Sequence, residues 1–441
     1  MAKDRRTTRR VTRVARLATA ALLVVGPLGA GSPSARAASA GGPGGEYFPV
    51  NPVRVLDTRL GQGAPLAKVR GGEAVNVTVA GVAGTGVPAT GVLAVALNVT
   101  ATNPTSSGYV TVYPAGTSLP LASTLNITAG RSAANLAVVG VGGGGQVSVY
   151  VNFGAADMVL DVVGWYASAD ASVSAGQGSR LIPVTPQRIL DTREGTGAPA
   201  APVGQTGIID VQVSGRFTDR NGATVNDLSA VVLNLTGTEP SFETFVTAYP
   251  AGLSRPEASS LNLLKGETRP NLVMVKMGAG GKVSLYNHLG RTHLVADVVG
   301  YYRAGADPAT YAGRVLPLSA PFRAFDTRDD GRRIGTNQVD TWDFSDFVGS
   351  LTRNGTSVGK VGGLVMNITA TDVTAGSYLT AYPSDAARPL ASNLNMEAGQ
   401  VIPNLAVVPL STNGVANRMN AYYLRGFSHY LADVSAIILG D

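Results

Sequence analysis

"RVLDTR" spans Arg54–Arg59, and the chain repeats it as "RILDTR" at Arg188–Arg193 and as "RAFDTR" at Arg323–Arg328. The shared aspartate recurs after 134 residues and then after 135, counted from 57 to 191 and from 191 to 326. A period of this length is that of a domain, because solenoid repeats are only ~20–45 residues long. The stretch therefore predicts three tandem copies of one fold.

Further landmarks recur in the same order in each copy. They are "LNVT", "LNLT" and "MNIT"; "VYPAG", "AYPAG" and "AYPSD"; "STLN", "SSLN" and "SNLN"; and the endings "LDVVGWY", "ADVVGYY" and "ADVSAII". We predict repeats at 47–166, 181–302 and 315–441, the third divergent, with linkers of flexible composition at 167–180 and 303–314.

Apolar and polar residues alternate with a period of two along short runs bounded by glycine and proline. In the first copy, Val75, Val77 and Val79 alternate with Asn76 and Thr78. This pattern is typical of strands with one buried face. It predicts strands near 53–59, 74–80, 92–101, 109–113, 123–128, 134–141, 146–152 and 158–166, and no helix after the N-terminal segment. The expected fold is all-β, with three tandem antiparallel β-sandwich domains of about 135 residues, jelly-roll wiring being one option.

The N-terminal segment has the layout of a secretory signal peptide. Six arginines between positions 5 and 16 precede the apolar run "LATAALLVVGPLG", and the small-residue site Ala35-Arg36-Ala37 follows. We predict a signal peptide at 1–37, with Ala38-Ser39-Ala40 as an alternative that moves the cleavage to 40. Arg9-Arg10 leaves twin-arginine export open beside the general secretory route.

Removal of this segment changes the charge of the chain. Residues 1–37 hold eight Lys/Arg and one acid, a net of +7, and the whole chain is +6, so the remainder is 6 − 7 = −1. A basic surface for nucleic acid is therefore not expected. No later apolar run approaches the ~20 residues that span a bilayer, so no membrane insertion is expected after signal removal. The chain has no cysteine. We expect a secreted product, extracellular or held noncovalently at the cell wall.

Each closing strand carries an aspartate among apolar residues on both faces, as in "MVLDVVGWY". A buried carboxylate needs a partner, because breaking a buried ion pair costs roughly 3–5 kcal/mol. We expect the pairs Arg59–Asp161, Arg193–Asp297 and Arg328–Asp433, with Arg54 as an alternative donor in the first copy. Asp57, Asp191 and Asp326 would hold the bend after their strand. These charges are predicted to brace the fold, and no catalytic residue is predicted.

Histidine offers a metal or acid–base interpretation that the repeats do not support. His293 and His429 lie four residues before the repeated aspartate, but the first copy has Asp157 at this position. His288 lies across a turn from His293 only in the second copy. The chain also lacks a G-x-S-x-G nucleophile motif. We predict no metal and no cofactor.

Aromatic pairs end the last strand of two copies, Trp165-Tyr166 and Tyr301-Tyr302, and Tyr422-Tyr423 lies on an earlier strand of the third. If exposed, they are candidate ligand-contact residues for sugar rings, since an aromatic side chain offers an apolar face and a polar edge. The alternative is that they close the core of the sandwich.

Taken together, the landmarks resemble a tandem-repeat module of secreted actinobacterial proteins with the pattern "PxR[IL]LDTR … LN[VL]T … YPAG … SxLN … NL … DVVGYY". The resemblance covers about 47–441, and the third copy departs from it at Phe325 and in "DVSAII". It implies an extracellular β-module. We expect a non-catalytic protein that binds cell-envelope or extracellular polysaccharide. The alternatives are a structural component of an envelope layer or appendage, and a hydrolase with an unrecognised site.

Overall fold

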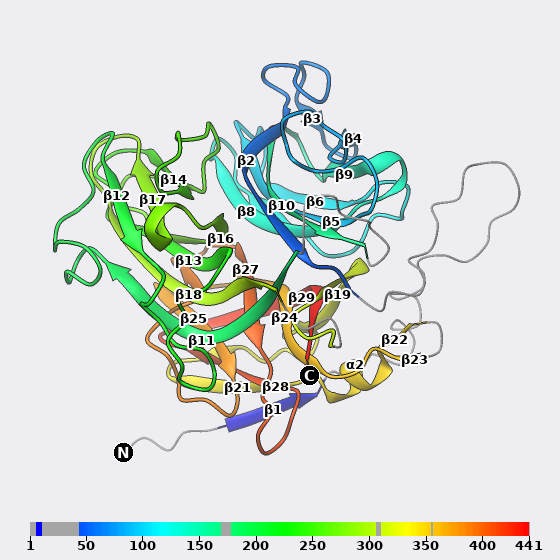
Figure 1. Cartoon of the computed structure of the whole chain (residues 1–441), viewed down its shortest axis with the longest axis vertical. Helices are drawn as coiled ribbons and strands as arrows, with labels where there is room; N and C mark the ends of the chain where they lie inside the picture. Colours follow the sequence, from blue (N-terminus) through cyan, green and yellow to red (C-terminus); the bar gives the residue numbers. More distant parts are fainter. Residues whose placement is uncertain (1–5, 11–43, 169–177, 306–309, 354–355, 441) are drawn as a thin grey trace, which may run out of the picture.

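The structure, a computed structural model, describes residues 6–10, 44–168, 178–305, 310–353 and 356–440. It is nearly all β, with 55% strand and 3% helix, which confirms the predicted fold class. The third repeat also contains a short helix, α2 (Ser345–Ser350), where the sequence pattern predicts none. Figure 1 shows three lobes that surround a common centre.

Each repeat contributes eight main strands. In the first repeat these are β2 (Tyr47–Asp57), β4 (Ala74–Thr78), β5 (Val92–Thr102), β6 (Gly108–Pro114), β7 (Leu125–Ile127), β8 (Ala133–Gly140), β9 (Gln146–Val151) and β10 (Ala155–Ala167), with the short β3 (Val69–Arg70) beside β10. In the second they are β11 (Ser179–Asp191), β12 (Ile208–Gln212), β13 (Ala230–Thr238), β14 (Thr244–Pro250), β15 (Leu261–Leu263), β16 (Arg269–Lys276), β17 (Lys282–Asn287) and β18 (His293–Ala304). In the third they are β19 (Val315–Asp326), β21 (Gln338–Asp343), β24 (Val361–Thr371), β25 (Ser377–Pro383), β26 (Leu394–Met396), β27 (Ile402–Pro409), β28 (Arg418–Tyr423) and β29 (Phe427–Leu439), with the short β20 (Ile334–Gly335), β22 (Thr352–Arg353) and β23 (Thr356–Ser357).

The strands of every repeat follow jelly-roll wiring. In the first repeat the large sheet has the order β2-β10-β5-β8 and the small sheet the order β4-β9-β6-β7. Numbered along the chain, these orders are first-eighth-third-sixth and second-seventh-fourth-fifth. The second and third repeats have the same two orders. The fold is therefore a set of two-sheet sandwiches of the jelly-roll type.

Each sandwich encloses its own core, formed by the alternate apolar residues that the sequence indicates. In the first repeat, Val147, Val149 and Val151 of β9 share this core with Leu97 and Val99 of β5. The neighbouring residues on these strands point the other way. The small sheet therefore turns its second face outward, and the large sheet turns its second face toward the other repeats.

The second faces of the three large sheets share one core at the centre of the molecule. It combines Ala96 and Val138 of the first repeat with Val232 of the second and Val365 and Val407 of the third. Around this centre the small sheets lie at the periphery in three directions: β4, β6 and β9 at the upper right of Figure 1, β12, β14 and β17 at the left, and β21, β25 and β28 at the bottom. The repeats thus form one pseudo-threefold body.

Three edge strands meet at the pseudo-threefold axis, and asparagines join them. The amide oxygen of Asn271 accepts a hydrogen bond from the backbone N–H of Leu136 (3.2 Å). The same bond recurs from Leu272 to Asn404 (3.1 Å) and from Leu405 to Asn135 (3.1 Å). The repeated "NL" landmark therefore closes a ring that links β8, β16 and β27.

The strands that begin the repeats also come together. Tyr47 pairs with Ser179, the N–H of Leu181 donates to Gly313 (2.8 Å), and the N–H of Gly45 donates to Val315 (2.9 Å). Strand pairing therefore reaches into the predicted linkers at both ends, while 169–177 and 306–309 lie outside the described residues.

Most of the predicted signal peptide also lies outside the described residues. Its described part is β1 (Arg6–Arg10), which pairs in parallel with the edge strand β21 of the third repeat.

Candidate functional site

The repeated aspartates bind arginine, but the donor differs from the expected one. Arg54, not Arg59, donates from Nε to Asp161 Oδ1 (3.0 Å) and from Nη1 to Asp57 Oδ2 (3.1 Å). The same pattern gives Arg188–Asp297 (2.9 Å) and Arg323–Asp433 (2.5 Å) in the other repeats. The predicted pairs Arg59–Asp161, Arg193–Asp297 and Arg328–Asp433 are therefore wrong, and the alternative donor, Arg54, is the one that binds Asp161.

The register of the sheet explains the correction. Asp161 of β10 lies opposite Arg54 of β2, and β2 ends at Asp57. Arg59 follows in the turn and folds back on Asp57, with Nε to Oδ1 at 2.8 Å, Nη2 to Oδ2 at 2.6 Å and its own N–H to Oδ1 at 3.1 Å. Arg193 binds Asp191 and Arg328 binds Asp326 in the same way. These aspartates hold the bend after their strands.

The two carboxylates bound by one arginine have opposite pKa shifts. Hydrogen bonds from Arg59 lower the pKa of Asp57. Burial raises the pKa of Asp161, and Arg54 only partly offsets it. Burial likewise raises the pKa of Asp297 and of Asp433. Desolvation disfavours the charged form, whereas an adjacent cation favours it.

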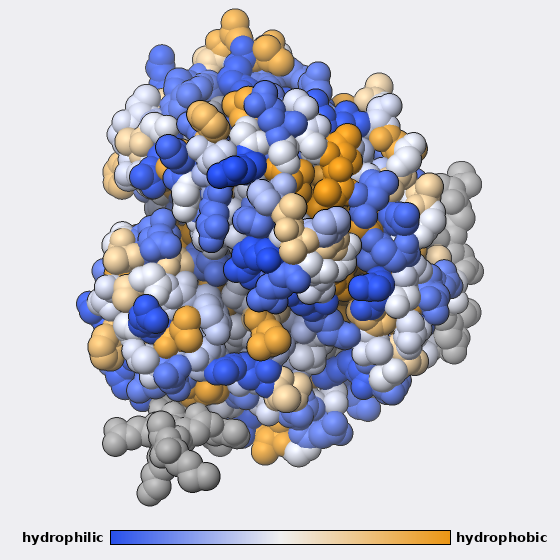
Figure 2. All heavy atoms as spheres, turned by 90° about the vertical axis from the view of Figure 1, so that its left-hand side faces the viewer, coloured by the Kyte–Doolittle hydropathy of each residue, from blue (hydrophilic) through white to orange (hydrophobic). Residues whose placement is uncertain are grey.

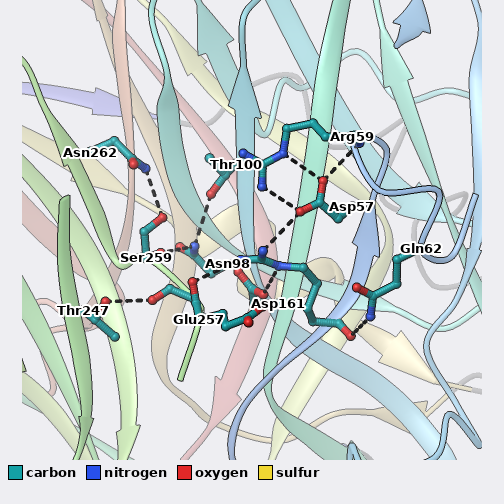
Figure 3. Close-up of polar contacts among 12 residues, drawn as sticks. Asp57, Arg59, Gln62, Asn98, Thr100, Asp161, Thr247, Glu257, Ser259 and Asn262 are labelled. Atoms are coloured by element: carbon teal, nitrogen blue, oxygen red, sulfur yellow. Dashed lines mark hydrogen bonds and ion pairs between the residues drawn. The ribbon is translucent and has the colours of Figure 1, made fainter. Parts of the chain in front are cut away.

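The arginine–aspartate pairs lie where the large sheet of one repeat contacts another repeat, and not inside a sandwich. We call these contacts the seams between repeats. Figure 3 shows the first seam, where Asn98 of the first repeat donates to the carbonyl of Ser259 in the second (2.6 Å). Arg54 Nη2 also reaches the carbonyl of Glu257 (3.3 Å). Equivalent bonds join Asn234 to Ser392 and Asn367 to Ser123 at the other seams. The repeated "LNVT" landmark thus ties each large sheet to a loop of another repeat.

A small cavity lies at the seam between the first and third repeats. Its volume is about 30 Å³, and Ser123, Asn367 and Asp433 are among its lining residues. A cavity of this size holds about one water molecule. Asp433 therefore faces a water-sized space at this seam.

Two of the three histidines bind threonines of the "DTR" stretches, and the third, His288, stacks on Phe245 with ring centroids 4.4 Å apart. Thr192 Oγ1 lies 3.0 Å from His293 Nδ1, and Thr327 Oγ1 lies 2.9 Å from His429 Nδ1. In the first repeat Thr58 donates to Asp157 (3.4 Å) at the same position. Within the described residues, no group of three His, Cys, Asp or Glu side chains is arranged to hold a metal ion.

The aromatic pairs at the end of the last strand are buried, so their assignment as ligand-contact residues is wrong. Trp165 is 3% exposed and stacks on Phe48 at 4.5 Å in the core of the first repeat. Tyr166 faces the shared centre, where its hydroxyl lies 2.6 Å from that of Tyr302. Tyr301 packs in the core of the second repeat. Strand alternation sends one ring of each pair into its own sandwich and the other into the centre.

A different aromatic pair lies on the outward face of every small sheet. In the first repeat, Tyr109 of β6 and Tyr150 of β9 have ring centroids 6.4 Å apart. Both are half-buried, and Val110 and Val149 beside them belong to the core. The equivalent pairs are Phe245 and Tyr286 (6.2 Å) and Tyr378 and Tyr422 (6.0 Å). Of these six rings, the sequence predictions named only Tyr422. The sequence contains the signal for all of them, since each ring alternates with core residues along its strand.

An asparagine lies directly across from the first ring of each pair. The cross-strand partners are Tyr109 with Asn126, Phe245 with Asn262, and Tyr378 with Asn395. All three asparagines are half-buried, and the flanking leucine, isoleucine or methionine residues point into the core. Each outward face therefore offers one half-buried ring and one amide. The second ring is half-buried only in repeat 1, because Tyr286 and Tyr422 are 7% and 4% exposed. We call these surfaces the outer faces of repeats 1, 2 and 3.

The outer faces lie within a mainly hydrophilic surface. Figure 2 looks at the left side of Figure 1, where the small sheet of the second repeat lies, and shows apolar groups gathered in limited patches among polar ones. In the third repeat the buried residues Val339, Tyr382 and Tyr422 form a cluster separate from the sandwich core.

Comparisons with known proteins find distant structural similarity and no match in sequence. No protein-family model matches the chain, and no curated protein matches it. Among solved structures, it is similar to a triple jelly-roll protein of an archaeal virus turret, at 9% identity over 90% of this chain and 91% of that one, with a TM-score of 0.19. It is also similar to the tandem domain CBM22-1-CBM22-2 of Paenibacillus barcinonensis Xyn10C, at 12% identity over 60% of this chain and 100% of that one, with a TM-score of 0.17.

The described residues include no helix that is long and apolar enough to span a membrane.

Proposed function

We propose that this protein is secreted and binds cell-envelope or extracellular polysaccharide, without catalysis, through its three outer faces. The observation that carries the proposal is the half-buried ring with an amide across from it that recurs on each face: Tyr109 with Asn126, Phe245 with Asn262, and Tyr378 with Asn395. An aromatic ring packs against the apolar face of a pyranose, and an amide both donates to and accepts from sugar hydroxyls.

The rest of the molecule supports a binding role. The repeated charges pair with one another within and between strands, so Arg54, Asp57 and Asp161 serve the fold. The leader-like segment at 1–37 and the net charge of about −1 for the remainder support an extracellular location and argue against nucleic acid as partner.

Retention on insoluble glycans tests the proposal. We expect the chain from Ala38 onward to be retained on at least one of peptidoglycan, chitin and cellulose. Replacement of Tyr109, Phe245 and Tyr378 by alanine should weaken retention at least about tenfold, which corresponds to ~1.4 kcal/mol. The matched control replaces Phe153 and Phe427 by alanine, since both rings are exposed and neither residue belongs to a small sheet.

Three results would contradict the proposal. Protein that stays in the supernatant with all three glycans would remove the glycan partner, and self-association without any glycan would favour the structural role. Equal retention of the outer-face variant and the control variant would remove the outer faces as the site. An unchanged melting temperature shows that each variant is folded.

A further inference from the structure

The three outer faces differ in the residue before a proline in the loop after β6, β14 or β25. It is Leu119 in the first repeat, Arg255 in the second and Arg388 in the third. The guanidinium of Arg255 lies 4.2 Å from the ring centroid of Tyr286, and that of Arg388 lies 3.8 Å from the centroid of Tyr422. Leu119 is 44% exposed. Two faces therefore carry a cation beside the aromatic pair, and one does not.

The two cations are held in place and keep their hydrogen-bond donors for another group. A cation over an aromatic ring is attracted by the ring quadrupole. The following proline restricts the backbone of each arginine to an extended conformation. Both side chains are exposed, and within the described part of the chain neither has an ion pair with a carboxylate. A guanidinium in this setting can receive a planar anion through two parallel N–H bonds.

The ligand that fits these groups together is a uronic acid. In the second repeat, Phe245 offers an apolar surface, Asn262 an amide and Arg255 a guanidinium. In the third, Tyr378, Asn395 and Arg388 do the same. A uronate residue has a pyranose ring, hydroxyls and one carboxylate, which match these groups one to one.

We propose that the outer faces of repeats 2 and 3 select polysaccharides that carry uronate carboxylates, while the outer face of repeat 1 takes neutral sugar. This inference rests on the proposed function of the same surfaces. It adds the substrate class and assigns the selectivity to Arg255 and Arg388.

Binding to polygalacturonate and to its fully methyl-esterified form tests the inference, because esterification removes the charge and keeps the sugar backbone. We expect the chain to bind the acid at least about tenfold more tightly than the ester, and added salt to reduce this preference. The double variant Arg255→Gln with Arg388→Gln should lose the preference and keep its binding to the ester. Leu119→Arg should raise binding to the acid alone.

The control removes two positive charges elsewhere, by Arg216→Gln and Lys360→Gln, at exposed loop positions. It should keep the preference for the acid. The inference is overturned if the unaltered chain binds both polymers equally, or if the double variant keeps the preference for the acid. Binding to the ester in either case leaves the proposed function intact. If neither polymer nor any of the three insoluble glycans binds, the proposed function fails as well. Melting temperatures confirm that the variants are folded.

Discussion

At the scale of residues, the two arginines of each "RxxDTR" stretch have different structural roles. Arg188 is 25% exposed and binds both Asp191 and Asp297, whereas Arg193 is 43% exposed and binds Asp191 alone. Loss of the first arginine leaves the buried carboxylate of Asp297 without a cation. Loss of the second still leaves Asp191 with Arg188.

We therefore predict that Arg188→Met destabilises the protein by about 3 kcal/mol or more, since breaking a buried ion pair from one side costs ~3–5 kcal/mol. Arg193→Met should cost clearly less. Denaturant unfolding monitored by far-ultraviolet circular dichroism measures both. If Arg193→Met destabilises the protein more than Arg188→Met does, the prediction is wrong and the arginine in the turn contributes more to stability.

The aspartates that hold the bends, Asp57, Asp191 and Asp326, affect how the free energy of unfolding changes as the pH falls. The pKa values of Asp57, Asp191 and Asp326 are lowered by their arginines against the opposing effect of burial. A group whose folded pKa lies below its unfolded value, ~3.9 for aspartate, stabilises the fold above that pH and loses this contribution as the pH falls through the folded pKa.

Replacement of these three aspartates by asparagine should therefore lower the free energy of unfolding at pH 7 and flatten its fall below about pH 4. The raised pKa of Asp161 works in the opposite direction, since its penalty is removed as that carboxyl is protonated. A pH series of denaturant titrations measures the slopes. Parallel slopes for the variant and the unaltered chain would contradict the assignment.

The sequence could predict which residues carry the charges, but not which arginine binds which aspartate. The choice depends on the end of β2 at Asp57 and on a register shift between Leu160 and Asp161. Alternation along the strand shows neither. The outer-face rings were within reach of sequence reasoning, because Tyr109 alternates with core valines and the strand period makes it point away from the core.

At the scale of elements, the edge strands β8, β16 and β27 are fixed by asparagines from other repeats. Asn271 accepts from the buried N–H of Leu136 and donates to Asn98 and to the carbonyl of Ser260. Sequence spacing located these asparagines, but the partner of Asn271 lies 135 residues away. No local pattern could identify it.

We predict that Asn271→Ala destabilises the protein by about 2–4 kcal/mol, because it leaves buried donors and acceptors unpaired at ~1–3 kcal/mol each. Asn262→Ala is the matched control in the same repeat. Its side chain lies on the outer face and binds Ser259 Oγ (3.3 Å), so its removal should change stability little and weaken glycan retention. Equal melting temperatures for the two variants would exclude the asparagine ring as a main support of β16.

At the scale of the whole molecule, the repeats share a core and so should not behave as independent domains. The closing strand "LDVVGWY" is apolar on both faces, a pattern that predicts burial within one sandwich. The structure shows that the second face packs against other repeats, as Val163 and Tyr166 do in the shared centre.

We therefore predict one cooperative thermal transition for the chain from Ala38 onward, with equal calorimetric and van't Hoff enthalpies. A chain that ends at 305 should expose Val232 and its neighbours in the shared core and aggregate. Three resolved transitions, or a soluble two-repeat chain with an unchanged melting temperature, would show that the shared core contributes little.

The same arrangement determines how the protein engages a polymer. Because the large sheets face one another at the centre, the three outer faces point away from it in different directions, and a single straight polysaccharide strand cannot lie along all of them (Figure 1). Sites that bind the same polysaccharide chain would increase the avidity for that chain. Sites that point in different directions bind separate polysaccharide chains and cross-link them.

We predict that the chain precipitates soluble polygalacturonate over a window of molar ratios, measured as turbidity. A variant with only the outer face of repeat 3 intact, Tyr109→Ala with Phe245→Ala, should still bind the polymer in affinity electrophoresis but leave the solution clear. Turbidity should return to baseline when protein is in large excess, because each strand is then saturated by separate molecules. A bound complex that stays clear at every ratio would place the outer faces of repeats 2 and 3 on one polysaccharide chain and contradict the divergent arrangement.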